Sequence, residues 1–299
     1  MESGSIEEDS ISGPIDLQAT LESGQTFLWN RTPGTAYRTD PPLESTPWYE
    51  TVHEGSVIAV RQTETGLEWK ASENVESVIR TRLGLEDDLD AILSAFPDAP
   101  VIDTAVERYR GLRLVNEPVF ETLVSFILSA QMRVERIHQL VNTLRREFGP
   151  EIRFEGESRY GFPRPEVLAR VPESEFRDLG LGYRAPYVRK TAEMVAEDGL
   201  ETASLAAKPY ESAREDLTGF VGVGNKVADC VLLFSLGFDE AVPLDTWIGS
   251  AIEEYFPDAA SDSYEETSAA IRRRFAPHPG YTQTYVFHHL RTDGDRGQR

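Results

Sequence analysis

The spacing of apolar residues changes near residue 74, and this change constrains the fold more than any other feature. From Leu17 to Trp69, apolar and polar residues alternate between turns rich in Pro and Gly, which predicts a small antiparallel sheet. From about Asn74 onward, apolar residues recur every three to four positions, which is typical of amphipathic helices. We therefore predict an α+β fold, with a mostly helical body behind a small antiparallel β-sheet domain.

The helical part divides at Pro and Gly. Helices are expected at 118–148 (one or two), 165–179, 185–197, 209–217, 225–236 and 244–255. We place an acidic, disordered tail at 1–12, an N-terminal α+β domain at 13–100 and a helical domain at 101–299.

Composition excludes several classes of protein. Cys230 is the single cysteine, so an intramolecular disulfide and a four-cysteine iron–sulfur site are both excluded. The five histidines show no convincing metal-ligand spacing, and we expect neither a metal nor a cofactor. No apolar run approaches the roughly 20 residues of a membrane span, and we see no signal peptide. A cytoplasmic protein, with no membrane association and no obligate protein partner, is expected.

The net charge is strongly negative. Asp and Glu number 51 against 30 Lys and Arg, which gives a formal charge of −21. An acidic, lysine-poor surface stays hydrated at high salt, so we hypothesise a halophilic source. Because salt weakens phosphate contacts, binding to nucleic acid would then depend on backbone amides and on local basic positions.

A glycine-rich turn joins two predicted helices, and the pair suggests a helix-hairpin-helix at about 213–236. Gly222 and Gly224 flank Val223, and Asn225 and Lys226 follow directly. Such a turn can present bare amides to a phosphate at a helix N-terminus, although the same pattern also occurs in ordinary tight loops.

Asp245 follows Pro243 at the start of the next predicted helix. It can serve as an N-cap and also as a carboxylate that stabilises positive charge on a sugar. A Lys after the hairpin and an Asp one helix later supply the two groups needed for covalent base excision.

These residues resemble a known signature. Positions 222–230 together with 242–245 are similar to the motif of 8-oxoguanine DNA glycosylases, within the helix-hairpin-helix superfamily of base-excision repair enzymes. The resemblance also covers 23–29, 126–150, 179–184 and 283–287. It implies that Lys226 attacks C1′ of the damaged nucleotide to form a Schiff base, with β-elimination following, and that Asp245 stabilises the sugar. The alternative for Lys226 is a surface lysine that contacts phosphate, which the presence of Asp245 makes the less favoured interpretation.

The resemblance also implies a pocket for the extruded base. Phe287 would stack on the purine, Gln283 would read its Watson–Crick edge, and the Gly24 carbonyl would accept the N7 hydrogen that only the oxidised base carries. Cys230 would line the same pocket. Core packing is the alternative for both Phe287 and Cys230.

Other matching residues imply contacts with the duplex. Tyr183 resembles a wedge residue, with Arg184 beside it, although a packed tyrosine in a helix C-cap loop is the alternative. Arg136 matches an arginine that contacts the opposite base. Gln131 and Met132 depart from the family's Asn-rich run, and Trp247 replaces a histidine, which puts cytosine specificity and one phosphate contact in doubt.

We therefore predict an enzyme that excises 8-oxoguanine from damaged double-stranded DNA and cleaves the strand as an AP lyase. Two alternatives stay open. One is a monofunctional glycosylase for alkylated bases, in which water attacks. The other is a non-catalytic helix-hairpin-helix protein that only binds DNA.

Overall fold

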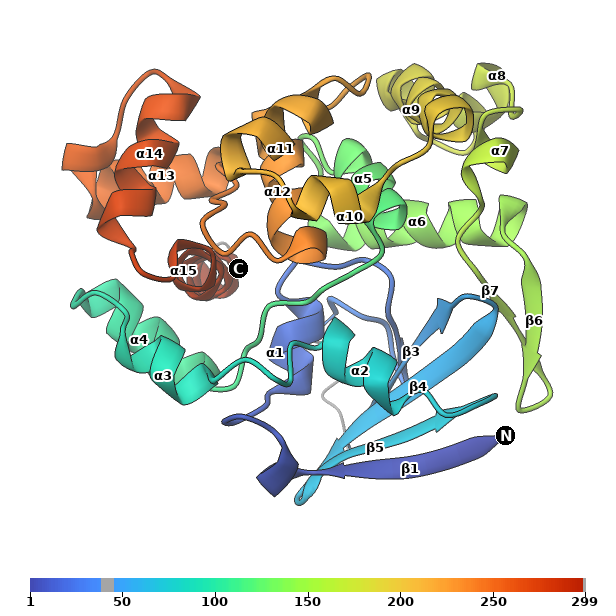
Figure 1. Ribbon diagram of the computed structural model, residues 1–299, viewed down its shortest axis with the longest axis horizontal. Coiled ribbons are helices and arrows are strands. Elements are labelled where there is room, and N and C mark those ends of the chain that lie inside the picture. The colour runs from blue at the N-terminus through green and yellow to red at the C-terminus, as the bar shows by residue number, and fades with distance from the viewer. Residues whose placement is uncertain (39–45, 298–299) are drawn as a thin grey trace.

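A computed structural model describes residues 1–38 and 46–297 of the chain (Figure 1). Five antiparallel strands form one sheet in the order β1-β5-β4-β3-β2. Their bounds are β1 (Glu2–Glu7), β2 (Asn30–Thr32), β3 (Trp48–His53), β4 (Ser56–Thr63) and β5 (Gly66–Ala71). The alternating pattern thus forms the predicted sheet, and the α+β class is confirmed.

The N-terminal segment is ordered, so the prediction of a disordered tail at 1–12 is wrong. β1 pairs with β5 along its whole length, from Glu2 opposite Ala71 to Glu7 opposite Gly66. Ile6 is buried in the core, and a short 3-10 helix, η1 (Glu8–Ser10), follows. Acidic composition suggested disorder, but the open edge of β5 supplies backbone partners to this segment.

The first part of the alternating region is helical rather than extended. α1 (Leu17–Glu22) begins at Asp16, whose carboxylate accepts a hydrogen bond from the Ala19 amide at 2.8 Å. This N-cap starts the helix. A buried loop then leads from Ser23 to β2.

Fourteen more helices lie in the described residues after β5. The first five are α2 (Glu76–Arg82), α3 (Leu89–Ser94), α4 (Pro100–Tyr109), α5 (Val119–Leu128) and α6 (Val134–Phe148). The other nine are α7 (Pro165–Leu168), α8 (Glu173–Asp178), α9 (Ala185–Asp198), α10 (Thr202–Ala206), α11 (Tyr210–Thr218), α12 (Asn225–Leu236), α13 (Thr246–Tyr255), α14 (Tyr264–Arg274) and α15 (Pro279–Gly297).

Most predicted helices are present, with three differences. The region 165–179 splits into α7 and α8, because Pro172 cannot continue a helix and instead begins α8. α13 starts at Thr246 because Asp245 is its N-cap. A hairpin of β6 (Glu151–Phe154) and β7 (Glu157–Tyr160) was not foreseen; its strands of four residues are too short to show a clear alternation.

One apolar core runs from the sheet into the helical body. Ile6, Val60 and Trp69 of the sheet belong to the same buried cluster as residues of α5, α6 and α12. Figure 1 shows α1 and α2 next to the sheet, with α5, α6 and α12 above them. A second cluster joins α4, α13, α14 and α15. The predicted domain boundary near residue 100 stays a prediction. Within the described residues, no helix combines the length and the apolar character that crossing a membrane requires.

Candidate active site

The turn between α11 and α12 is held against α9. Gly222 has a φ of 84°, and a Cβ atom there would lie 2.6 Å from the Cβ of Tyr187. Thr191 donates a hydrogen bond from Oγ1 to the Val221 carbonyl at 2.8 Å. Both the conformation and the packing therefore require glycine at 222.

The N-terminus of α12 is open. Gly224 occupies the N-cap position and offers no side chain to cap the first turn. A Cβ atom at Gly224 would meet no atom within 4 Å, whereas Val223 beside it is buried. First-turn amides of a helix lack carbonyl partners within the helix, so this end is suited to binding a phosphate.

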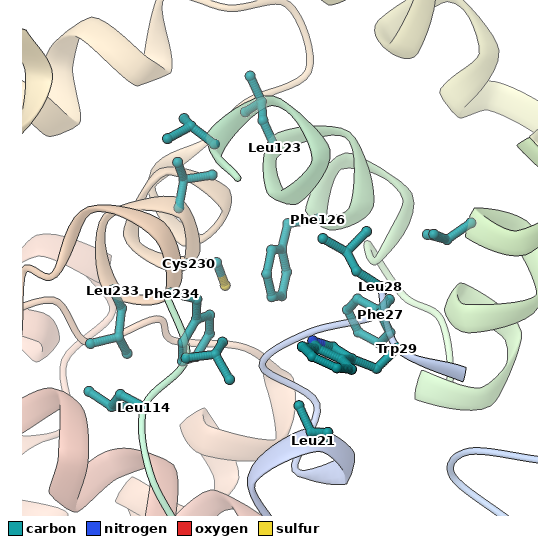
Figure 2. Packing of buried hydrophobic residues seen from close by; sticks show 14 of the residues in the cluster. Leu21, Phe27, Leu28, Trp29, Leu114, Leu123, Phe126, Cys230, Leu233 and Phe234 are labelled. Atoms are coloured by element: carbon teal, nitrogen blue, oxygen red, sulfur yellow. The ribbon is translucent and has the colours of Figure 1, made fainter. Parts of the chain in front are cut away.

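Lys226 lies one position into α12, and its side chain is half-buried. Its Nζ donates to Oγ of Ser129 at 3.0 Å and lies 4.9 Å from the centre of the Phe126 ring. Phe126 in turn packs between Phe27 and Phe234, with a centroid distance of 5.7 Å to each (Figure 2). The amine is thus held in a defined position over an apolar wall.

Cys230 lies one turn further along α12 and beside Phe126 (Figure 2). Burial raises the pKa of its thiol to about 12, and the charges of Lys226 and Asp245 both act on it, the former lowering the pKa and the latter raising it. The thiol is therefore neutral at ordinary pH.

Asp245 is the N-cap of α13, where its Oδ1 accepts a hydrogen bond from the Ile248 amide at 2.9 Å. The residue before it is fixed as well, because the Leu244 amide donates to the Tyr264 hydroxyl at 3.2 Å. The carboxylate therefore caps α13, as the sequence predicted, through Oδ1.

The buried carboxylate of Asp229 connects the helix of Lys226 to the segment of Asp245. Asp229 accepts hydrogen bonds from the hydroxyls of Tyr210 and Tyr264, each at 2.6 Å. Burial raises the pKa of Asp229 to about 6, although both hydrogen bonds lower it. Through Tyr264, Asp229 links α12, which carries the lysine, to the segment that carries Asp245.

The residues predicted to bind the base come together from opposite ends of the chain. A Cβ atom at Gly24 would lie 3.6 Å from Cε1 of Phe287. Gln283 precedes Phe287 by one turn of α15 and is 4% exposed. Its Oε1 is buried and accepts no hydrogen bond from any residue in 1–38 or 46–297. Buried acceptors are nearly always satisfied, so this oxygen is suited to a donor on a ligand.

The predicted wedge residue is exposed, but its neighbour is not. Tyr183, in η2 (Gly182–Arg184), is 51% exposed and packs edge-on against Tyr187. Arg184 is 7% exposed, stacks on the Tyr183 ring at 4.3 Å, and donates to the Ala130 carbonyl. That Arg184 also contacts DNA stays a prediction. In the structure, Arg184 joins the segment 180–184, here called the wedge loop, to the turn after α5.

Gln131 lies on that turn, exposed, with a φ of 52°. Arg136 is exposed as well and lies beside the wedge loop, because a Cβ atom at Gly180 would be 2.8 Å from its Nη2. Tyr183, Gln131 and Arg136 therefore share one surface next to the hairpin. Met132 is half-buried, and the side chain of Trp247 lies outside the described residues.

Several residues at the site were not singled out in the sequence. They are Ser129, Phe126, Tyr187, Asp229, Tyr264 and Arg291. Their contacts join separate elements, so only the adjacency of Asp229 to Cys230 could have drawn attention to any of them. Among the described residues, no group of three His, Cys, Asp or Glu side chains could hold a metal ion.

Family models match both parts of this arrangement. Residues 124–277 match the HhH-GPD superfamily of base excision DNA repair proteins, and residues 10–123 match the 8-oxoguanine DNA glycosylase N-terminal domain. The chain belongs to the HhH-GPD superfamily. It is thus an enzyme of base excision DNA repair, as the residues of the hairpin and Asp245 predicted.

Three similar proteins cover most of the chain. A probable N-glycosylase/DNA lyase of Methanothermobacter thermautotrophicus is 31% identical over 94% of this chain and 95% of its own length. The N-glycosylase/DNA lyase of Saccharomyces cerevisiae is 31% identical over 83% of this chain and 70% of its own. The crystal structure of Clostridium acetobutylicum 8-oxoguanine glycosylase/lyase, in complex with double-stranded DNA containing cytosine opposite 8-oxoguanine, superposes with a TM-score of 0.83 at 25% identity. That alignment covers 94% of this chain and 93% of the other.

Proposed function

We propose that this HhH-GPD enzyme excises 8-oxoguanine from duplex DNA and then cleaves the strand as an AP lyase. The observation that carries the proposal is the Tyr264 hydroxyl, which donates to Asp229 on the lysine helix and accepts from the Leu244 amide, directly before Asp245. A glycosylase that uses water as its nucleophile needs the carboxylate but not the lysine. The names of the relatives, which combine glycosylase and lyase, agree with the two-step reaction.

Excision begins when the Lys226 amine, in its neutral form, attacks C1′ of the damaged nucleotide. The C1′–N9 bond breaks, and the base leaves with the bonding electron pair and takes up a proton. Positive charge that develops on the sugar is stabilised by the Asp245 carboxylate. Ser129, which accepts a hydrogen bond from Nζ, orients the amine toward the sugar.

Strand cleavage follows from the same covalent bond. The C1′–O4′ bond opens to leave an imine between C1′ and Nζ, and the imine makes the C2′ proton acidic. Removal of that proton expels the 3′ phosphate by β-elimination. Hydrolysis of the imine then releases the enzyme with its lysine restored, so the reaction needs no cofactor.

Selection of the lesion is assigned to the pocket formed by Gly24, Gln283 and Phe287. The Gly24 carbonyl would accept the N7 hydrogen of 8-oxoguanine, the Phe287 ring would stack on the purine, and Gln283 would bind its Watson–Crick edge. The buried, unsatisfied Oε1 of Gln283 supports this role. Cys230 is assigned to the lining of the same pocket.

Binding to the duplex is assigned to the open α12 N-terminus and to the surface that carries Tyr183, Gln131 and Arg136. Amides at the Gly222, Val223 and Gly224 turn would hold a phosphate without adding positive charge. Tyr183 would fill the gap left by the extruded base. Gln131 replaces part of the Asn-rich run that reads the opposite base in the family, so we expect the choice of opposite base to depend on it.

The test is borohydride trapping on duplexes that carry one 8-oxoguanine opposite each normal base. We expect a covalent protein–DNA adduct that is lost in Lys226→Gln and kept in Lys70→Gln, whose lysine lies on β5 and pairs with Glu155 in the β6–β7 turn. If base release occurs without an adduct on alkylated DNA only, the chain is an alkylbase glycosylase instead. Binding without release of any base would make it a non-catalytic DNA-binding protein.

We further propose that the enzyme works at high salt, in the cytoplasm where it meets the nucleoid. The formal charge of −21 supports the first part, because an excess of surface charge keeps a protein hydrated in concentrated salt. Activity and solubility measured from about 0.1 M to molar KCl should then rise rather than fall. A monotonic loss of activity with salt, as counterion release alone predicts, would contradict it.

A further inference from the structure

Arg291 lies where the two halves of the proposed base pocket meet. It follows Gln283 and Phe287 on α15 at successive spacings of four residues, so the three side chains project from neighbouring positions of one helix. Its Nη2 donates to the carbonyl of Glu22 at 2.7 Å. Glu22 is the last residue of α1, and Gly24 follows it by two positions.

The guanidinium of Arg291 also faces the pocket itself. A Cβ atom at Gly24 would lie 2.8 Å from its Nη1, and its Cζ is 5.5 Å from the centre of the Phe287 ring. Nη2 is 3.2 Å from Nδ1 of His288, which fixes the side chain from its own helix. The cation is therefore seated between the Gly24 turn and the ring that would stack on the base.

The rest of the Gly24 turn is fixed by groups outside α15. The Gln25 amide donates from Nε2 to the carbonyls of Thr20 and Arg113, each at 2.8 Å. The Tyr37 hydroxyl donates to the carbonyl of Thr26 and lies 3.2 Å from that of Leu21. These bonds join the turn to α1, Arg113 and Tyr37, but not to α15. The Arg291 bond to Glu22 joins the end of α1, next to the turn, to α15, which carries Phe287.

We propose that Arg291 is a positioning residue for lesion discrimination, which sets the spacing between the Gly24 carbonyl and the Phe287 ring. The inference rests on the proposed function, because it concerns the slot that the oxidised purine would enter. Discrimination there depends on one hydrogen bond to N7, and a misplacement of about 1 Å in such a contact can reduce a rate about 100-fold. An arginine suits this task because its planar fork places two nitrogens at once.

The experiment separates recognition of the base from the chemistry at the sugar. Single-turnover excision is measured on duplexes with 8-oxoguanine and with undamaged guanine, and β-elimination is measured on a duplex with a preformed abasic site. An abasic site has no base to recognise, so its cleavage needs Lys226 but not the slot. The variants are Arg291→Met and Arg291→Lys, with Arg153→Met on the β6–β7 hairpin, where the arginine is exposed, as the matched control.

We expect Arg291→Met to lose about 10- to 100-fold in 8-oxoguanine excision and in preference over guanine, with abasic-site cleavage within about twofold of wild type. Arg291→Lys keeps the charge but not the planar fork, so its rate of 8-oxoguanine excision should lie between those of Arg291→Met and the wild type. Arg153→Met should change neither reaction.

Two results would overturn the inference alone: unchanged 8-oxoguanine excision in Arg291→Met and Arg291→Lys, or an equal loss of excision and abasic-site cleavage in both. A wild-type protein that cleaves abasic sites but leaves 8-oxoguanine in place would overturn the proposed function itself.

Discussion

Two regions of the active site are built in opposite ways. The catalytic segment, residues 222–245, contains the hairpin turn, Lys226, Cys230 and Asp245 in one continuous stretch of chain. The proposed recognition pocket, assigned to Gly24, Gln283 and Phe287, joins a loop near the N-terminus to the last helix. The hydrogen bond from Arg291 to Glu22, which spans 269 residues, ties these two parts together.

The difference shows which properties depend on local stereochemistry and which depend on packing. In the catalytic segment, a glycine turn and a helix N-cap place the reactive groups, so short-range rules suffice. In the recognition pocket, the spacing depends on how the sheet domain packs against α15. Changes in the catalytic segment should therefore stop both reactions, whereas changes in the pocket should affect only the choice of base.

The largest effect is expected from Asp245→Asn. Asparagine is as good an N-cap as aspartate, so the bond from the Ile248 amide and the start of α13 should be kept. The negative charge that stabilises the sugar is lost, and rates of both excision and abasic-site cleavage should fall on the order of 100- to 1000-fold. Single-turnover kinetics on the two substrates, with thermal unfolding as the control, measure this. A loss confined to excision would contradict the comparison.

Gly24→Ala should break the recognition pocket alone. The added Cβ would be 2.8 Å from Nη1 of Arg291, at a φ of 96° that alanine rarely adopts. We expect excision of 8-oxoguanine to fall between about 10- and 100-fold, while abasic-site cleavage stays near wild type. Gly55→Ala is the matched control, because Gly55 has a φ of 86° but nothing within 4 Å of the added atom. Equal losses on both substrates would show that the two regions are not separable.

The same contrast explains what could be read from the sequence. Periodicity and caps gave the sheet and most helices, and the motif around Lys226 identified the chemistry, because these depend on neighbours in the chain. The strand at Glu2–Glu7 was missed because its partner, β5, lies about sixty residues away. The bond from Arg184 to the Ala130 carbonyl could not be predicted either, because it exists only once η2 and the turn after α5 are packed together. Arg291 is a further instance of such a long-range contact.

Two glycines of the hairpin should respond differently to the same change, which sharpens the account of the catalytic segment. Gly222→Ala forces a positive φ on alanine and a clash with Tyr187, and we expect it to destabilise the fold by about 1–3 kcal/mol. Gly224→Ala places its methyl group in open space, so stability should change little while binding to duplex DNA weakens several-fold. Chemical unfolding and fluorescence anisotropy separate the two. Equal destabilisation by both would contradict the open position of Gly224, and unchanged DNA binding in Gly224→Ala would contradict the proposed phosphate site.

The smallest effect concerns Asp229, which joins the lysine helix to the Asp245 segment. Its pKa is raised to about 6 in the folded state, so its contribution to stability is fully present below the unfolded value and is lost as the pH rises through 6. Between pH 5 and 7 the wild type should therefore lose about 1 kcal/mol relative to Asp229→Asn, which does not titrate. Urea unfolding of both proteins at the two pH values measures this difference. A constant difference would mean that Asp229 titrates in the folded protein as it does in the unfolded chain. In that case the carboxylate would support the catalytic segment through its two tyrosine hydrogen bonds without any energetic cost of burial.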